Sequence, residues 1–552
     1  MKKIILILLL LAGAGFWFLR SAAAPDPDSA YYAAYLPADT WAVLSLFDLR
    51  GLSRAFPDSA PGKFFAKETM RGLLAERGAD EEAVRRYEKF YDGAADLFRS
   101  PVLQRLFGDD ATLALLAPDP ARLRQDPEAE RRRTLLAFGS SAAASTVAAL
   151  ARLTMSEVSQ EQTAAGLELT RIHLDDDESL YGTVRDGVII LAYSPETVTA
   201  AIRQQEQGGG LDSSPQFAAA QKFWAEEAAD SHFFAKFYSN VATLQTALAA
   251  AGQHEAAVRL QGFTSLSAAA AERQGELRFR SRTDCEPARL HEAVRQARAR
   301  QRGQRNLALH LLNKQSLLYF WFSGLETDLF SAADPTSLDE KARQLFGLPF
   351  AEVMAALGPQ AAVSLGELAS TGLFPVPTVS LAVQARQPEQ ARQLLTALRS
   401  RLAAELGRLA AEQTTEAAGQ SLHHWNLLPA DAAHPALALS GGLLYFANGE
   451  SRLQRLLAQE QEEGAMLQLL GPELAAAFSA ADSAAFVLRP ARLAAAMQQA
   501  AGWLQPAFPV LTEKLRAELT QLFQTLDLAA GWSQTEDNHA LLFLVLRKKA
   551  VQ

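Results

Sequence analysis

Cysteine is almost absent from this chain, since Cys285 is the single cysteine among 552 residues. No intramolecular disulfide can form, so folded domains must rest on core packing alone. Cys285 ends a predicted strand, which favours a structural residue over a catalytic thiol. The chain also lacks the G-x-S-x-G nucleophile turn and the G-x-x-x-x-G-K-[ST] phosphate loop. The usual signatures of serine hydrolases and of P-loop nucleotide-binding proteins are therefore missing.

Positive charge is also in short supply. The chain has 53 Lys and Arg residues against 62 Asp and Glu residues, which gives a formal net charge of −9. Nucleic acids and anionic membrane surfaces demand a broad basic face. We therefore expect no nucleic-acid partner.

Long apolar runs are limited to one, at residues 4–19, between Lys2, Lys3 and Arg20. This pattern is typical of a bacterial export signal, and the positive-inside rule places the two lysines in the cytoplasm. We predict an uncleaved signal anchor at residues 1–24, with a removed signal peptide as the alternative, and a linker at 25–30. In both cases the remaining chain lies in the periplasm, held at the inner membrane in the first case and secreted in the second.

The most informative feature that is present is a repeated order of elements. A strand pair around the turn Arg185-Asp186-Gly187 is followed by a helical pattern, and the same succession recurs around Ser440-Gly441-Gly442. Each half also closes with a predicted hairpin. The order predicts an internal duplication, with a first lobe at 31–285, a basic linker helix at 286–305 and a second lobe at 306–552.

Each lobe reads as α+β. Consecutive strand candidates joined by short turns favour a mainly antiparallel sheet covered on one face by helices. In the second lobe, apolar residues recur at helical spacing from 391 to 409, which predicts one long amphipathic helix. The expected fold is therefore two similar α+β lobes behind one membrane segment.

Three short motifs resemble those of a known group. They are the opening Leu36-Pro37-Ala38-Asp39-Thr40, the turn at Asp186-Gly187, and an extended segment that leads into an amphipathic helix at 377–398. Together with the N-terminal anchor they resemble an uncharacterised family of bacterial envelope proteins, a domain of unknown function. The second lobe departs from the opening motif, with Leu311-Leu312-Asn313-Lys314-Gln315 in its place. The resemblance implies a location and a fold, and no site.

Candidate chemical residues are few. His423, His424 and His434 lie near Asp431 and are residue types that bind zinc, yet adjacent strand residues point to opposite faces. The run Asp175-Asp176-Asp177-Glu178 lacks the alternating spacing of a calcium loop and reads as a solvated hairpin turn. Ser440 reads as part of a tight turn, not as a nucleophile. We predict no catalytic, cofactor-binding or metal-binding residue.

The linker stands out because it is basic within an acidic protein. Its arginines could contact anionic head groups or an acidic partner, although a solvated linker helix is the favoured interpretation. These candidate contacts are Arg289, Arg295, Arg298, Arg300, Arg302 and Arg305.

The sequence leaves three classes of function open. We expect a non-enzymatic envelope protein that binds or scaffolds an envelope partner. The alternatives are a carrier that encloses a lipid or other apolar ligand, and an enzyme with an unrecognised site. A flat exposed apolar patch favours the first class, a deep apolar cavity the second, and convergent carboxylates and histidines the third.

Overall fold

The computed structural model describes residues 30–99, 104, 107, 110–140, 158–162, 166–175, 178–228, 231–325, 334–370, 375–458, 469–500 and 512–549. The chain divides into two compact units, unit 1 at Met1–Arg295 with Asp537–Phe543 and unit 2 at Gln296–Glu536 with Leu544–Gln552. The expected anchor at 1–24 lies outside the described residues. Within the part that is described, no helix has the length and apolarity needed to cross a membrane.

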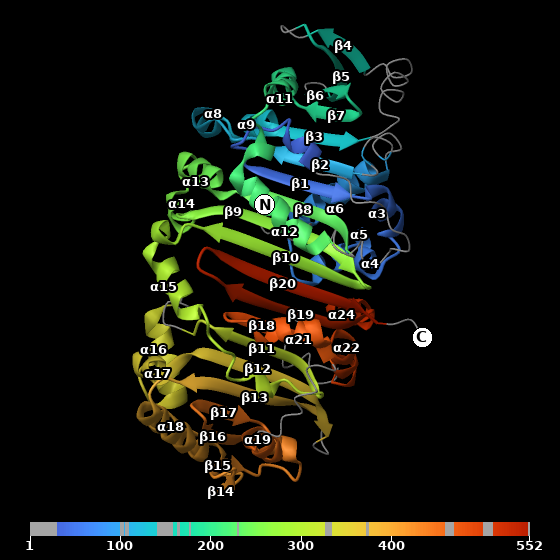
Figure 1. Ribbon diagram of the computed structural model, residues 1–552. Helices are drawn as coiled ribbons and strands as arrows, with labels where there is room; N and C mark the ends of the chain where they lie inside the picture. The colour runs from blue at the N-terminus through green and yellow to red at the C-terminus, as the bar shows by residue number, and fades with distance from the viewer. Residues whose placement is uncertain are drawn as a thin grey trace. The chain divides into compact units, whose positions relative to one another are not determined.

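Unit 1 contains an antiparallel sheet (Figure 1). Its strands lie in the spatial order β4-β5-β6-β7-β3-β2-β1-β8-β9-β10. They are β1 (Ala42–Phe47), β2 (Asp110–Leu115), β3 (Leu135–Ser140), β4 (Val158–Gln162), β5 (Glu168–Asp175), β6 (Glu178–Arg185), β7 (Val188–Ala192), β8 (His232–Asn240), β9 (Phe263–Arg273) and β10 (Glu276–Cys285).

Unit 2 contains a second antiparallel sheet, in the order β14-β15-β16-β17-β13-β12-β11-β18-β19, and β19 pairs in turn with β20. Its strands are β11 (Ser316–Ser323), β12 (Leu357–Ser370), β13 (Pro375–Ala385), β14 (Glu412–Ala417), β15 (Gln420–Trp425), β16 (Ala436–Ser440), β17 (Leu443–Ala447), β18 (Ala484–Leu488) and β19 (Leu526–Thr535). The strand β20 (His539–Lys548) is divided, since its residues up to Phe543 belong to unit 1 and those from Leu544 belong to unit 2.

The two sheets have the same strand order when β1 to β10 are matched with β11 to β20 in chain order. The matching hairpins also turn alike. Asp186 and Gly187 between β6 and β7 have φ of 50° and 81°, and Gly441 and Gly442 between β16 and β17 have φ of 57° and 79°. Two successive positive φ values define the tight turns that suit a twisted hairpin. Residues can therefore be compared between the units by strand and register.

Helices connect the strands. In unit 1 they are α2 (Ala30–Ala33), α3 (Leu49–Ala55), α4 (Ala60–Phe64), α5 (Lys67–Glu76), α6 (Glu81–Arg99), α8 (Pro120–Gln125), α9 (Pro127–Thr134), α11 (Pro195–Gln207), α12 (Pro215–Ala228), α13 (Val241–Ala250) and α14 (His254–Arg259). In unit 2 they are α16 (Pro335–Phe346), α17 (Phe350–Ala356), α18 (Pro388–Leu406), α19 (Glu450–Leu457), α21 (Pro472–Ser479), α22 (Pro490–Gln499) and α24 (Glu513–Gln524). The helix α15 (Glu292–Gln301) contains the boundary between the units.

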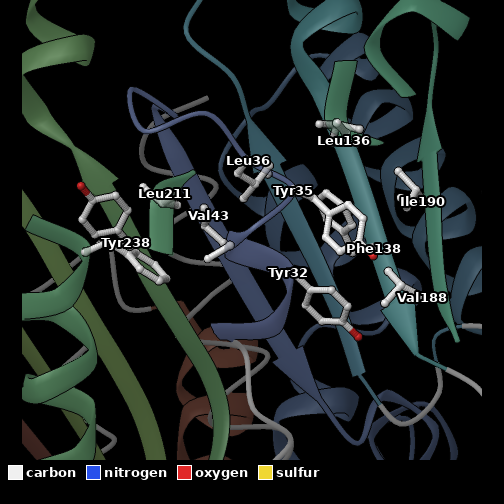
Figure 2. Packing of buried hydrophobic residues seen from close by; sticks show 14 of the residues in the cluster. Tyr32, Tyr35, Leu36, Val43, Leu136, Phe138, Val188, Ile190, Leu211 and Tyr238 are labelled. Atoms are coloured by element: carbon white, nitrogen blue, oxygen red, sulfur yellow. The ribbon is translucent and has the colours of Figure 1, made fainter. Parts of the chain in front are cut away.

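The core of unit 1 lies on one face of its sheet. Tyr32 of α2 and Tyr35 pack against Phe138 of β3, with ring centroids 5.6 and 6.0 Å apart (Figure 2). Leu36 and Leu136 are fully buried in the same cluster. The aromatic rings bury large apolar areas, so this cluster holds the segment before β1 against the centre of the sheet.

The opening motif of the first lobe forms a turn. The Pro37 carbonyl accepts from the Thr40 amide at 3.0 Å, and the Leu36 carbonyl accepts from the Leu211 amide at 2.7 Å. The Thr40 hydroxyl also donates to the Pro37 carbonyl, at 2.7 Å. These bonds satisfy the backbone just before β1 and fix where that strand begins.

The core of unit 2 also gathers aromatic rings. Phe478 of α21 lies between Tyr319 of β11 and Trp532 of β19, with centroid distances of 6.3 and 6.4 Å. The Trp321 indole donates to Gln360 at 3.1 Å, which satisfies its buried N–H.

Helices pack on both faces of the unit 2 sheet, so the expectation of one covered face is wrong there. Leu444 of β17 packs in a cluster with residues of α16, α17 and α18. Tyr445 and Ala447 point to the other face because side chains alternate along a strand. Ser380 is the register partner of Ala447, and Arg452 of α19 reaches it there. Helices cover both faces because strands such as β11, S-L-L-Y-F-W-F-S, carry apolar side chains on both faces.

Candidate functional site

The basic segment is not the single helix expected at 286–305, because η2 (Pro287–Arg289) and α15 (Glu292–Gln301) are separate and Arg302 and Arg305 lie beyond α15. Arg289 ends η2 and pairs with Glu286 at 3.2 Å, while Arg295 of α15 pairs with Glu292. Arg298 donates to the Glu536 carbonyl at 2.9 Å. The remaining candidates, Arg300, Arg302 and Arg305, have exposed side chains.

The histidine cluster does not converge. His423 and His424 are both buried in β15, but His423 lies 3.2 Å from Glu412 and His424 lies 3.3 Å from Glu450. His434 Nε2 instead contacts the Leu428 carbonyl, at 2.8 Å. Across the described ranges, no group of three or more His, Cys, Asp and Glu side chains is arranged to hold a metal ion.

Two further candidates from the sequence are the acidic run at 175–178 and the single cysteine. Asp175 and Glu178 are register partners at the β5–β6 turn, while Asp176 and Asp177 lie outside the described residues. Cys285 is buried at the end of β10.

A polar cluster in unit 2 was not predicted from the sequence. Arg452 of α19 is only 5% exposed and donates to three hydroxyls. Its Nε lies 2.5 Å from Ser380 Oγ, Nη1 lies 3.2 Å from Thr378 Oγ1, and Nη2 lies 3.4 Å from Ser364 Oγ. Ser364 also lies 3.1 Å from Ser316 Oγ of β11. We call Arg452, Ser364, Thr378 and Ser380 the Arg452 cluster.

The charge of Arg452 is surrounded by hydroxyl groups. No carboxylate pairs with it among the residues that the structure describes, and all its polar contacts are hydroxyls. Burial, together with repulsion from Arg455, lowers the pKa of Arg452 to about 10. An uncompensated buried cation is costly, because the interior replaces only part of its hydration.

Further cations lie at the same end of the sheet. Arg489 and Arg492 both donate to the Lys314 carbonyl, at 2.9 and 3.4 Å. Arg492 also pairs with Glu367 at 2.9 Å. Burial, then repulsion from Arg492, lowers the pKa of Arg489.

The matching positions of unit 1 are mainly apolar. Leu136 pairs with Ala192 as Ser380 pairs with Ala447, and Ala114 pairs with Leu136 as Ser364 pairs with Ser380. Leu136 and Ala114 are fully buried. The sheet architecture therefore accepts an apolar core at this place.

One signal for the cluster was visible in the sequence. Arg452 precedes Leu456 by one helical turn, and Leu453 precedes Leu457 in the same way, so the arginine lies within the apolar stripe of α19. A charged residue in such a stripe predicts a buried charge.

Each sheet also carries a row of apolar side chains on the face opposite to Ser380 in unit 2 and to Leu136 in unit 1. In unit 2, register pairing places these side chains in one row across five strands, which we call the outer row of unit 2: Phe446, Leu381, Val363, Phe320 and Phe486. Phe320 is 40% exposed and Leu381 37%, and the other members are half-buried.

Unit 1 has a row at the matching register positions. The outer row of unit 1 comprises Leu191, Ala137, Leu113, Leu44 and Phe237. Leu113 is 40% exposed, and the other members are half-buried. All ten positions of the two outer rows are thus apolar, and none of them is fully buried. Side chains at directly paired positions on one face of a sheet contact each other.

A surface cleft of about 400 Å³ lies in unit 1 between α9 and the start of α11. Its two arginines are paired, since Arg132 lies 3.5 Å from Glu128, and Arg133 lies 2.6 Å from Glu130. The Arg133 guanidinium, which hydrogen-bonds Glu130, lowers the pKa of that carboxyl. Most of the residues that line the cleft carry charged or hydroxyl-bearing side chains.

No family model matches the chain, and no curated protein matches it. Among solved structures, crystal form III of TP0453 is similar to part of the chain, at 10% identity over 50% of this chain and 85% of that chain, with a TM-score of 0.23. Crystal form I of TP0453 gives 9% identity, 49% and 83% coverage and a TM-score of 0.24.

Proposed function

We propose that this chain is a non-enzymatic envelope protein that binds another envelope protein through the outer rows of its two units. In this proposal the segment at 1–24 anchors the chain in the bacterial inner membrane and both units lie in the periplasm. The charge pattern of Lys2, Lys3 and Arg20 around the apolar run supports that location.

The observation that carries the proposal is the pair of matched outer rows. Phe320 and Leu381 in unit 2, and Leu113 in unit 1, are each more than a third exposed although they are large and apolar. Scattered apolar side chains are common on protein surfaces, but contiguous rows mark interaction sites. Repetition at matching register positions in two units supports a shared use.

The shape of the rows favours a protein over a lipid. Pockets for small apolar ligands enclose most of the ligand surface. The outer row of unit 2 lies on the same face as Leu444, so α16, α17 and α18 cover part of that face, and Phe320 stays 40% exposed. Leu113 in the outer row of unit 1 is also 40% exposed. Flat surfaces with aromatic residues at the centre are typical of protein interfaces.

The proposal includes an origin by duplication. The common strand order and the matching turns at Asp186-Gly187 and Gly441-Gly442 support it. An experimental structure in which 31–285 and 306–552 superpose with equivalent strands paired would support the duplication. A different pairing order in the two halves would overturn it.

The basic segment is a second proposed contact, for an acidic part of the same partner. Exposed Arg300 in the last turn of α15, and exposed Arg302 and Arg305 after it, supply positive charge. Such a contact weakens with salt because exposed charges are screened beyond roughly 8 Å at physiological ionic strength. Replacing these arginines by glutamine should lower the salt dependence of partner capture, and an unchanged dependence would remove them from the interface.

The partner can be captured directly in cells. A photo-crosslinking amino acid placed at Phe320, Leu381 or Leu113 should yield a discrete crosslinked protein that mass spectrometry identifies. Matched controls at the exposed positions Arg203 of α11 and Arg455 of α19 should not yield it. Equal yields from row and control positions, or crosslinks only to lipid, would contradict the proposal.

The location has a separate test. Fractionation should leave the full-length chain with the membrane, and a truncated chain that starts near Ala30 should be soluble and folded. Mature protein that begins at Ala24 and is recovered from the soluble periplasm would overturn the anchor and leave the periplasmic location standing.

A further inference from the structure

The outer row of unit 2 is part of a larger apolar area on three neighbouring strands. On β11, β12 and β13 the row comprises Phe320, Val363 and Leu381. The residues two positions before and after each of them lie on the same face, because side chains alternate along a strand. All six are apolar, and register pairing places them in two further rows: Leu318, Leu365 and Val379 in one, and Phe322, Ala361 and Val383 in the other. We call these nine residues the apolar strip of unit 2.

The sheet face is covered on both sides of the apolar strip. On the β17 side, Leu444 packs in a cluster with residues of α16, α17 and α18. On the β19 side, Ala529 continues the row of Leu318 across β18 and is buried. Between them, Phe320 is 40% exposed and Leu381 is 37% exposed. The face is therefore open over β11 to β13 and closed on either side.

The open part of the face has the width of one helix. Neighbouring strands lie about 4.8 Å apart, so β11 and β13 are about 10 Å apart, and a helix with its side chains is about 10–12 Å across. Along each strand the apolar strip spans about 13 Å, which equals the rise of about nine helical residues. A second sheet would be wider than this opening and would meet α16, α17 and α18, whereas one helix fits beside them.

We propose that the element of the envelope partner that covers the apolar strip is a single amphipathic helix, which lies along β11, β12 and β13 with its apolar stripe on Phe320 and Leu381. Amphipathic helices bury such a stripe against apolar surfaces. Helices of this chain already pack on the same face at Leu444, so the partner helix extends an existing layer of helices. This inference rests on the proposed function, because it concerns the partner that the outer row of unit 2 binds.

Photo-crosslinking in cells measures the conformation of the bound element. The crosslinking amino acid is placed in turn at Leu318, Phe320 and Phe322 of the full-length chain, and mass spectrometry identifies the partner residue that each position captures. The strand rises about 13 Å from Leu318 to Phe322, so these two positions should capture residues about nine apart in a helix. An extended strand on the same line would give captured residues about four apart, which would overturn the proposal.

A second comparison crosses the apolar strip and uses two exposed positions, so it decides the question even if a crosslinker at Leu318 or Phe322 prevents folding. Phe320 and Leu381 should capture residues within about one turn of each other, because a single helix spans the opening. Captured residues on segments far apart in the partner sequence would show a second sheet and overturn the helix.

The control separates failure of the helix from failure of the proposed function. Arg455 of α19 is exposed and should capture no partner. Capture at Phe320 and Leu381 with the wrong spacing overturns the helix and leaves the proposed function standing. Capture no greater than at Arg455 contradicts the proposed function, and the helix with it.

Discussion

Ser380 of β13 and Leu136 of β3 hold the same place in the two sheets, because each pairs with the last alanine of the neighbouring strand, Ala447 and Ala192. One residue receives a hydrogen bond from a buried arginine and the other belongs to an apolar core. Backbone pairing is thus alike in the two units, while the chemistry beside it differs.

The Ser380 hydroxyl should stabilise its surroundings. Ser380→Ala leaves the buried Arg452 Nε without its acceptor, which we expect to cost about 1–3 kcal/mol locally. Hydrogen exchange of β13 and α19 measures this loss. The control Ser421→Ala removes an exposed hydroxyl from β15 and should change nothing there. Equal exchange in both variants would show that the bond contributes little.

Asp482 should make unit 2 less stable as the pH rises. Burial raises the pKa of Asp482 above its ordinary value, even though the Thr535 amide donates to both carboxylate oxygens at 2.9 Å. The folded state therefore holds the proton more tightly than the unfolded state. The contribution of protonated Asp482 to the stability of unit 2 is fully present below the pKa of the unfolded state, about 3.9. This contribution is lost as the pH rises through the pKa of the folded state.

Asp482→Asn removes this titration. The opening free energy measured by hydrogen exchange at the Thr535 amide should fall from pH 4 upward in the wild type and change less in the variant. Parallel pH profiles would contradict the assignment.

His423 should have the opposite effect. Burial, with repulsion from Arg399, lowers the pKa of His423 below its ordinary value. The folded state disfavours the charged ring, so stability is lost as the pH falls from about 6.5 through the folded pKa. The opening free energy that hydrogen exchange measures in β14 and β15 should fall over that range in the wild type and not in His423→Asn. His254→Asn, at an exposed position of α14, is the control and should behave as the wild type.

The histidine cluster should matter for stability and not for function. Because His424 is 1% exposed and lies 3.0 Å from Asn426 Oδ1, its removal should loosen β15. Replacing His423, His424 and His434 together by alanine should still complement a deletion strain at permissive temperature. Stoichiometric zinc in the wild type that is lost with function in the variant would make the non-enzymatic proposal wrong.

The sequence patterns predicted local structure more accurately than they predicted how the elements pack. The Asp186-Gly187 and Gly441-Gly442 dipeptides predicted tight turns because few other residues tolerate positive φ. The long helix was predicted from its apolar spacing, although α18 ends at Leu406, and Leu409 beyond it is 75% exposed. An apolar spacing alone does not mark where burial ends.

The sites depended on contacts that no local pattern reveals. The apolar stripe of α19 indicates that Arg452 is buried, but its partners Ser364 and Ser380 are far away in sequence and only strand pairing brings them together. The outer rows likewise become visible only when the register of five strands is known. Continuous apolar runs such as β11 predicted buried strands, and they could not indicate that Phe320 is left partly open.

The central claim is that the outer rows bind the partner, and breaking both rows tests it most directly. The measurement is the yield of the crosslinked partner from cells that carry Leu113→Glu together with Phe320→Glu, with the crosslinker at Leu381. We expect a loss of at least about tenfold, because a buried charge is costly at an apolar interface. Arg203→Glu with Arg455→Glu should keep the yield. An undiminished yield from a folded Leu113→Glu, Phe320→Glu protein would contradict the claim.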